Sequence, residues 1–215
     1  MIKIAPSILS GDFANMGKSV EDATAWGADY IHFDVMDGVF VPNITFGMPM
    51  CKAIRKHTTL PIDAHLMITL PEKYVQAFCD AGADIVTFHP DASQDVAGAL
   101  DVIKKNGKAC GLVLNPDKGL ELVAPYMDRI DMLVLMGVYA GFGGQKFIPE
   151  VLGKISEAHR MIVESRRDIR LELDGGVTEE NAKSMTDRGV DVVVGGSSVF
   201  RSADPAKTIR ILRGE

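Results

Sequence analysis

The sequence predicts a single (β/α)8 TIM barrel with parallel strands. Two observations lead to this fold class. Eight short apolar runs rich in β-branched residues recur along the 215 residues, and amphipathic segments of helical length separate them. A doubly wound open sheet would carry Gly-x-Gly-x-x-Gly after its first strand, whereas this chain reads Ser-Ile-Leu-Ser-Gly-Asp-Phe there. The first strand therefore favours the closed barrel.

Strands are expected where apolar character extends over both faces, because the strands of a parallel barrel are covered on each side. In chain order they cover residues 2–8, 29–35, 60–67, 84–89, 108–114, 131–136, 169–174 and 190–195. Helical patterns lie between them, as at 17–29, 71–84, 95–107 and 178–191. Several of these end in Gly-Ala-Asp or Gly-Val-Asp, where glycine favours the end of a helix. Because no linker-like stretch interrupts the series, we expect residues 1–215 to form one domain.

Composition excludes several classes of partner. The chain carries 23 Lys and Arg against 29 Asp and Glu, a net charge of −6, and has no basic stripe for nucleic acid. No apolar run is long enough to span a membrane, and the N-terminus has no usable signal segment, so we expect a cytoplasmic protein. Cys51, Cys79 and Cys110 have no disulfide or zinc spacing. We also expect a homo-oligomer.

Polar residues at the predicted strand ends form a candidate metal site. His32 and Asp34 are two residues apart near the end of the second strand, so both project from the same face. His65 ends the third strand and Asp174 the seventh. Two imidazoles and two carboxylates from three strands suit one divalent ion such as zinc, manganese, iron or cobalt. His89 ends the fourth strand and is a weaker candidate for the pocket lining.

Glycine clusters follow the last three strands and predict a phosphate site. Loops after the late strands of such barrels often bind phosphate through exposed amides, and glycine permits a close approach of the backbone. The candidate residues are Gly141, Gly143 and Gly144 after the sixth strand, Gly175 and Gly176 after the seventh, and Gly196 and Ser197 after the eighth.

Several motifs, in order, resemble the ribulose-phosphate 3-epimerase family. They are APSILSGDF, HFDVMDGVFVPNITFG, DAHLMI, GFGGQKFIPE, LDGGV and GGSSVF, spread over residues 5–200. The resemblance implies a TIM barrel that interconverts D-ribulose 5-phosphate and D-xylulose 5-phosphate. It also implies a divalent metal, zinc or iron among others, on His32, Asp34, His65 and Asp174. In addition, it implies a substrate-binding Ser7, pocket walls formed by Met36, Met67 and Met136, and phosphate held by the last three loops. We also expect His65 to contact the substrate.

Epimerisation next to a ketone needs a proton removed from one face and another returned to the opposite face. Two carboxylates on either side of a planar intermediate can do this, and we predict these roles for Asp34 and Asp174. The metal would stabilise the cis-enediolate, because a carboxylate with a pKa of about 4 is otherwise too weak a base.

Two alternatives remain open. One is a ketohexose-phosphate 3-epimerase acting on allulose 6-phosphate, and the other is a catalytically silent phosphate-binding barrel.

The loop after the sixth strand departs from the family pattern of a hydroxyl residue followed by Val, Asn or Glu, and Pro. Here it reads Gly137-Val138-Tyr139-Ala140. Loss of the proline adds backbone freedom, so we expect the loop to be more mobile or shaped for a different sugar.

Overall fold

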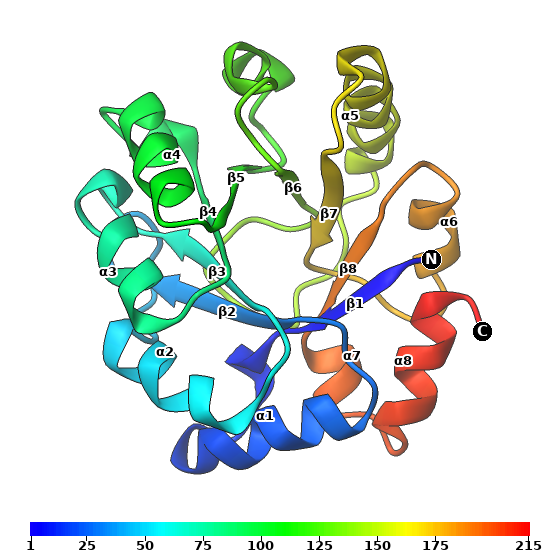
Figure 1. Ribbon diagram of the computed structural model, residues 1–215. Coiled ribbons are helices and arrows are strands. Elements are labelled where there is room, and N and C mark those ends of the chain that lie inside the picture. Colours follow the sequence, from blue (N-terminus) through cyan, green and yellow to red (C-terminus); the bar gives the residue numbers. More distant parts are fainter.

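The computed structural model describes all residues, 1–215. Eight parallel strands surround the centre of the molecule and helices cover them on the outside (Figure 1), so the predicted fold class is confirmed. The strands are β1 (Lys3–Pro6), β2 (Ile31–Met36), β3 (Ile62–Met67), β4 (Ile85–Phe88), β5 (Ala109–Leu114), β6 (Met132–Met136), β7 (Arg170–Asp174) and β8 (Val192–Gly195).

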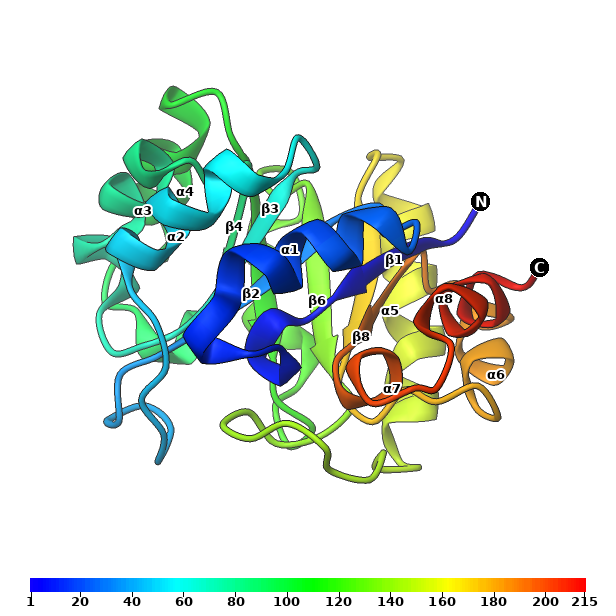
Figure 2. The same cartoon turned by 90° about the horizontal axis from the view of Figure 1, so that it is seen from below.

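The hydrogen-bonded order of the sheet is β1-β8-β7-β6-β5-β4-β3-β2. An isolated parallel bridge between Ser7, just after β1, and His32 in β2 joins the two ends, so the barrel is nearly closed. Because all neighbouring strands run parallel, their carboxyl ends lie at one end of the barrel. Figure 2 shows the long loops after β2 and β6 together at that end.

The helices pack around the barrel through one large apolar core. They are α1 (Met16–Ala25), α2 (Met48–Ile54), α3 (Val75–Ala81), α4 (Val96–Lys105), α5 (Val151–Ser165), α6 (Ala182–Thr186), α7 (Ser197–Phe200) and α8 (Pro205–Arg213). Fully buried side chains such as Phe33, Phe78 and Leu100 fill the space between strands and helices. A smaller cluster, which includes Ala5, Val134 and Val192, fills the inside of the barrel.

The connection between β5 and β6 departs from the predicted series of β-then-α units. In place of an α-helix it forms two short 3-10 turns, Leu120–Leu122 and Ala124–Tyr126. Gly119 and Pro125 explain this, because both residues disfavour a continuous helix. Lys154 of α5 extends its ammonium group to this connection and donates to the carbonyls of residues 115, 116 and 118, at 3.1, 2.6 and 2.6 Å.

No helix of the structure is both long enough and apolar enough to span a membrane.

Candidate active site

Strand register brings the four candidate metal ligands together. Asp34 of β2 lies beside His65 of β3, and His32 precedes Asp34 by two residues on the same face. Asp174 ends β7, on the far side of β1 and β8 from β2. All four residues are buried, with exposed fractions between 0 and 8%.

The ligand atoms of this cluster all lie within 4.8 Å of one another. His32 Nε2 is 3.2 Å from Asp34 Oδ1 and 3.6 Å from Asp174 Oδ2. His65 Nδ1 is 3.3 Å from each of the same two oxygens. Two nitrogens and two carboxylate oxygens therefore face a common point.

The two imidazole nitrogens that face this point make no hydrogen bond, although both are buried. A buried nitrogen without a partner is costly, because it has lost its water and gained nothing in return. A divalent ion at the common point would satisfy both nitrogens, and the mixed imidazole and carboxylate set suits zinc, iron, manganese or cobalt. The residues present therefore fit a metal.

Charge pairing inside the cluster shifts the pKa values of its members in opposite directions. Burial lowers the pKa of His32, but the carboxylates around it, first Asp34, outweigh burial and raise the pKa well above its usual value. The pKa of His65 is also raised, against the effect of burial, by the nearby carboxylates of Asp174 and Asp34. Burial would raise the pKa of Asp34, yet the two imidazoles lower it. Burial and the nearby Asp34 would raise the pKa of Asp174, but His32 and His65 lower it overall.

A second group of polar residues lies deeper in the barrel, around the outer sides of the two histidines. His32 Nδ1 is 2.8 Å from Asp63 Oδ2 and 3.6 Å from Glu172 Oε1. His65 Nε2 is 3.0 Å from His89 Nε2. Asp63, Glu172 and His89 are fully buried. Burial, and then the neighbouring Asp63, raise the pKa of Glu172 well above its usual value, while burial lowers that of His89 well below its own.

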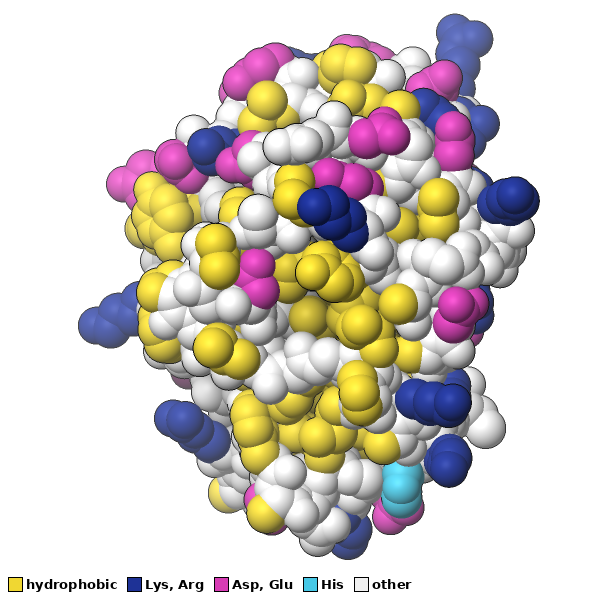
Figure 3. Space-filling view, turned by 90° about the vertical axis from the view of Figure 1, so that its left-hand side faces the viewer, with side chains coloured by type: hydrophobic (Ala, Val, Ile, Leu, Met, Phe, Trp, Pro, Cys, Tyr) yellow, Lys and Arg dark blue, Asp and Glu magenta, His cyan; other side chains and the backbone are white.

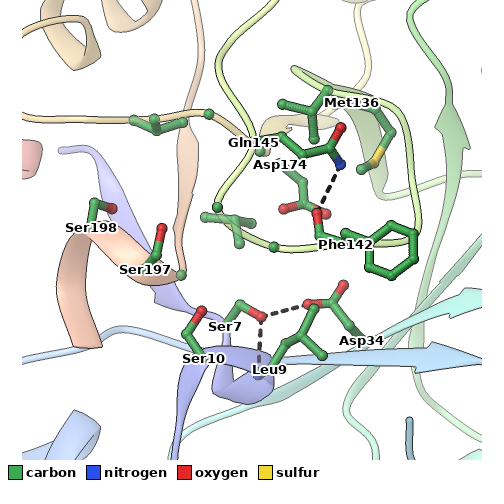
Figure 4. Close-up of a pocket in the computed structure, with 18 of the residues that line it drawn as sticks. Ser7, Leu9, Ser10, Asp34, Met136, Phe142, Gln145, Asp174, Ser197 and Ser198 are labelled. Carbon is green, nitrogen blue, oxygen red and sulfur yellow. Dashed lines mark hydrogen bonds between the residues drawn. The ribbon is translucent and has the colours of Figure 1, made fainter. Parts of the chain in front are cut away.

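A cavity of about 650 Å³ opens above the four candidate metal ligands. Asp34 and Asp174 reach its floor, and their carboxylates approach from opposite sides of the pocket (Figure 4). Ser7 lies beside them and donates its hydroxyl hydrogen to Asp34 Oδ2. His32 and His65 lie below the floor and do not line the cavity.

The remaining predicted site residues line the same cavity. These are Met36, Met67 and Met136 on its walls, and Gly141, Gly143, Gly144, Gly175, Gly176, Gly196 and Ser197 in the loops at its mouth. The methionines are almost fully buried; Met36 and Met67 end the neighbouring strands β2 and β3, and Met136 ends β6. His89, the weaker candidate, lies beneath the cavity against His65 and does not line it.

Two of these glycines are required by their surroundings. Gly175 and Gly176 have φ values of 102° and 73°, a region that side chains rarely adopt. A Cβ at Gly176 would also lie 2.5 Å from the Phe147 backbone. The turn after β7 therefore packs directly against the loop after β6.

Comparison with known proteins identifies the family. The model of the ribulose-phosphate 3 epimerase family matches residues 3–200. The chain belongs to this family. It is 46% identical over 215 residues to the ribulose-phosphate 3-epimerase of Bacillus subtilis, covering 100% of this chain and 99% of that protein. It is 48% identical over 213 residues to the enzyme of the same name from Escherichia coli K12, covering 99% and 95%. The predictions of the family and of an isomerase acting on carbohydrates are confirmed.

More distant solved structures share the epimerase fold. A 3-hexulose-6-phosphate synthase from Salmonella typhimurium superposes with a TM-score of 0.74 at 21% identity, covering 99% of this chain and 97% of that one. A tryptophan synthase α-subunit variant from Pyrococcus furiosus gives a TM-score of 0.72 at 15% identity, with complete coverage of both chains. At these identities the likeness supports the barrel alone.

The atypical loop of this epimerase-family chain is held by side chains from two other loops and by its own Gln145. Asn43 donates to the Gly141 carbonyl at 2.9 Å, and Asn115 accepts from the Ala140 amide at 3.2 Å. Gln145 donates to the carbonyls of Tyr139 and Phe142, each at 2.8 Å. At its start, Gly137 donates to the Asp174 carbonyl at 2.6 Å and accepts from the Ile148 amide at 2.9 Å.

Several pocket residues of this epimerase-family chain were not predicted from the sequence. Leu9, Ser10, Lys146, Asn181 and Arg201 also line the cavity. Ser10 and Leu9 follow Ser7 in the APSILSGDF motif, which could have indicated them. Lys146 lies in the GFGGQKFIPE motif, which could have indicated it. Asn181 and Arg201 follow loops whose path the sequence pattern does not specify. The deeper Asp63 carried a signal too, since it precedes His65 by two residues and so shares its face.

Proposed function

We propose that this chain is a metal-dependent 3-epimerase that interconverts D-ribulose 5-phosphate and D-xylulose 5-phosphate. The observation that carries the proposal is the facing pair of carboxylates, Asp34 and Asp174, at the floor of a cavity whose mouth is formed by glycine-rich turns. The sequence identity to proteins of that name over the full chain supports the substrate.

In the proposed reaction one carboxylate takes the C3 proton and the other returns a proton to the opposite face, with roles exchanged in the reverse direction. Ser7 would hold Asp34 in position through its hydroxyl hydrogen bond. A divalent metal on the four ligands would act as a Lewis acid for charge developing on the C2 and C3 oxygens. Zinc, iron, manganese and cobalt all suit this ligand set.

The cavity walls and mouth support the rest of the substrate. Met36, Met67 and Met136 are apolar and carry no exchangeable proton, so they would exclude water from the reacting carbon. The amides of the glycine turns and of α7, whose N-terminus faces the pocket at Gly196 and Ser197, would bind the phosphate.

The proposal also covers the cellular location and the oligomeric state of the protein. Burial of all three unpaired cysteines supports a cytoplasmic location, because such thiols are typical of reducing compartments.

Figure 3 shows hydrophobic side chains gathered on the side of the molecule that carries α2 and α3. The exposed Ile44 and Tyr74 precede these helices, and this surface supports a homo-oligomer.

Hydrogen exchange in D2O tests the two-base assignment. Asp34→Asn and Asp174→Asn, assayed at saturating metal, should each lower interconversion by roughly 10² to 10⁴. Each variant should still exchange the C3 hydrogen of one epimer only, and the two variants should choose opposite epimers. The exposed Asp168→Asn serves as the control and should behave as wild type. Near-normal turnover in either active-site variant, or exchange of the same epimer by both, would exclude two bases.

Paired assays decide between the open alternatives. Higher kcat/KM on allulose 6-phosphate than on ribulose 5-phosphate would favour the ketohexose enzyme. Absence of turnover on both substrates in metal-loaded protein would favour the silent barrel. Metal analysis of freshly purified protein identifies the ion.

A further inference from the structure

The two histidines of the metal cluster present different ring nitrogens. His32 directs Nε2 toward the two carboxylates, whereas His65 directs Nδ1. A neutral imidazole that offers a lone pair from one nitrogen carries its proton on the other. The cluster therefore requires opposite tautomers in its two histidines, and something outside the cluster must select each of them.

We propose that Asp63 and His89 are positioning residues that select these tautomers, an inference that rests on the metal-dependent function proposed above. Each of them contacts the outer nitrogen of one ligand histidine, and neither reaches the substrate cavity. Acceptors behind ligand histidines fix the ring orientation and raise the basicity of the metal-facing nitrogen.

Asp63 acts on His32. The two residues lie side by side in the register of β2 and β3, and Asp63 Oδ2 is 2.8 Å from His32 Nδ1. Both side chains are fully buried. A carboxylate can only accept from a ring N–H, so this contact holds the proton of His32 on Nδ1 and leaves the Nε2 lone pair for the metal.

His89 acts on His65. Their Nε2 atoms are 3.0 Å apart, so one of them donates and the other accepts. Because Nδ1 of His65 faces the carboxylates, its proton belongs on Nε2, and His89 accepts. His89 must then carry its own proton on Nδ1. The two ring centroids are 5.2 Å apart with 30° between the ring planes, so the rings meet edge to edge through their Nε2 atoms. The Phe40 ring centroid lies 4.8 Å from that of His89, and this contact restricts the orientation of the His89 ring.

The arrangement is asymmetric. His32 receives its support from a carboxylate, and His65 from an imidazole that carries no negative charge. Asp63 should therefore contribute more to metal affinity than His89, because an anionic acceptor polarises the donor ring more strongly.

Nitrogen-15 NMR of the zinc-loaded wild type tests the tautomers directly. Long-range correlations should show a protonated Nδ1 in His32 and in His89, and a protonated Nε2 in His65. A bare Nε2 in His65, or a bare Nδ1 in His32, would overturn the proposal. This measurement needs no variant to fold.

Zinc affinity, measured by competition with a chelator, provides the second test. Asp63→Ala and His89→Phe should weaken zinc binding by roughly 10- to 100-fold. His89→Gln should lose less, because its amide oxygen can still accept from His65 Nε2. His57→Phe is the matched control, since His57 is half exposed and pairs only with Glu21 at the surface.

The outcomes separate this inference from the proposed function. If wild-type protein bound no zinc, iron, manganese or cobalt, the proposed metal-dependent function itself would be wrong. Wild-type binding with unchanged affinity in folded Asp63→Ala and His89→Phe would overturn the positioning roles alone. Equal losses in His89→Phe and His89→Gln would assign His89 a packing role instead.

Discussion

Replacing Gly137 with alanine should destabilise the protein and slow its turnover, although the family pattern has a larger residue at this position. A Cβ built at Gly137 would lie 2.2 Å from the Gly175 carbonyl oxygen and 2.9 Å from the Phe147 ring. Ordinary contact begins at 3.4 Å, so the first pair must separate by about 1.2 Å, the difference between 3.4 and 2.2 Å. Gly175 has a positive φ and sits between Asp174 and Gly176, so the displacement passes to the catalytic aspartate proposed above.

The expected magnitudes follow from this displacement. Overpacking of this kind costs about 1–3 kcal/mol. For a chain of this size each kcal/mol lowers the melting temperature by about 2–4 °C, which gives a fall of about 2–12 °C. Misplacing a reacting group by about 1 Å can lower the rate by roughly 10²-fold. Calorimetry and a ribulose 5-phosphate assay measure the two effects.

Gly153→Ala is the matched control. Gly153 lies on the exposed side of α5, and a Cβ added there would have no neighbouring atom within 4 Å. Alanine at this position should stabilise the helix by about 0.5–1 kcal/mol and leave turnover unchanged. A Gly137→Ala variant with wild-type melting temperature and turnover would refute the reasoning, because it would mean that the turn after β7 moves freely.

Three further predictions concern charge and loop shape. Metal-free protein should lose stability as pH rises through the raised pKa of His32, since this contribution is complete below about pH 6.5. Zinc affinity should rise over the same interval, and flat profiles would contradict both. Lys146→Gln and Arg201→Gln, at the pocket rim, should each lower kcat/KM roughly two- to fivefold at low salt and less in 0.5 M salt, where charges are screened to about 4 Å. Replacing Tyr139-Ala140 with Asn-Pro removes the Ala140 N–H that donates to Asn115, a loss that outweighs the gain in rigidity, so KM should rise by roughly two- to fivefold; unchanged KM and kcat on pentulose and hexulose phosphates would dismiss a role for the loop.

The barrel and the four clustered ligands could be predicted because they depend on short-range regularities. Alternation placed His32 and Asp34 on one face, and the common direction of parallel strands placed His65 and Asp174 at the same end. The glycine turns were predictable for a similar reason, since they follow their strands directly.

Other features depend on contacts that no local pattern records. His89 was only a weaker candidate for the pocket lining, and it lies beneath the floor, where Phe40 from the loop after β2 packs against it. Two 3-10 turns replace the helix expected after β5, because Gly119 and Pro125 disfavour a continuous helix there. The contact of Gly137 with Gly175 joins two loops that are distant in sequence, so neither loop alone indicates it.

Lys154 donates to three carbonyls of the connection between β5 and β6, so the outer connections of the barrel are not equivalent. A ring of eight equivalent units could be reopened at any outer connection with similar effect. Here, new chain ends introduced at residues 116–119 would separate carbonyls that one ammonium group holds together, whereas ends at 106–107 would leave them intact. Circularly permuted forms of the chain should therefore tolerate the second cut better than the first.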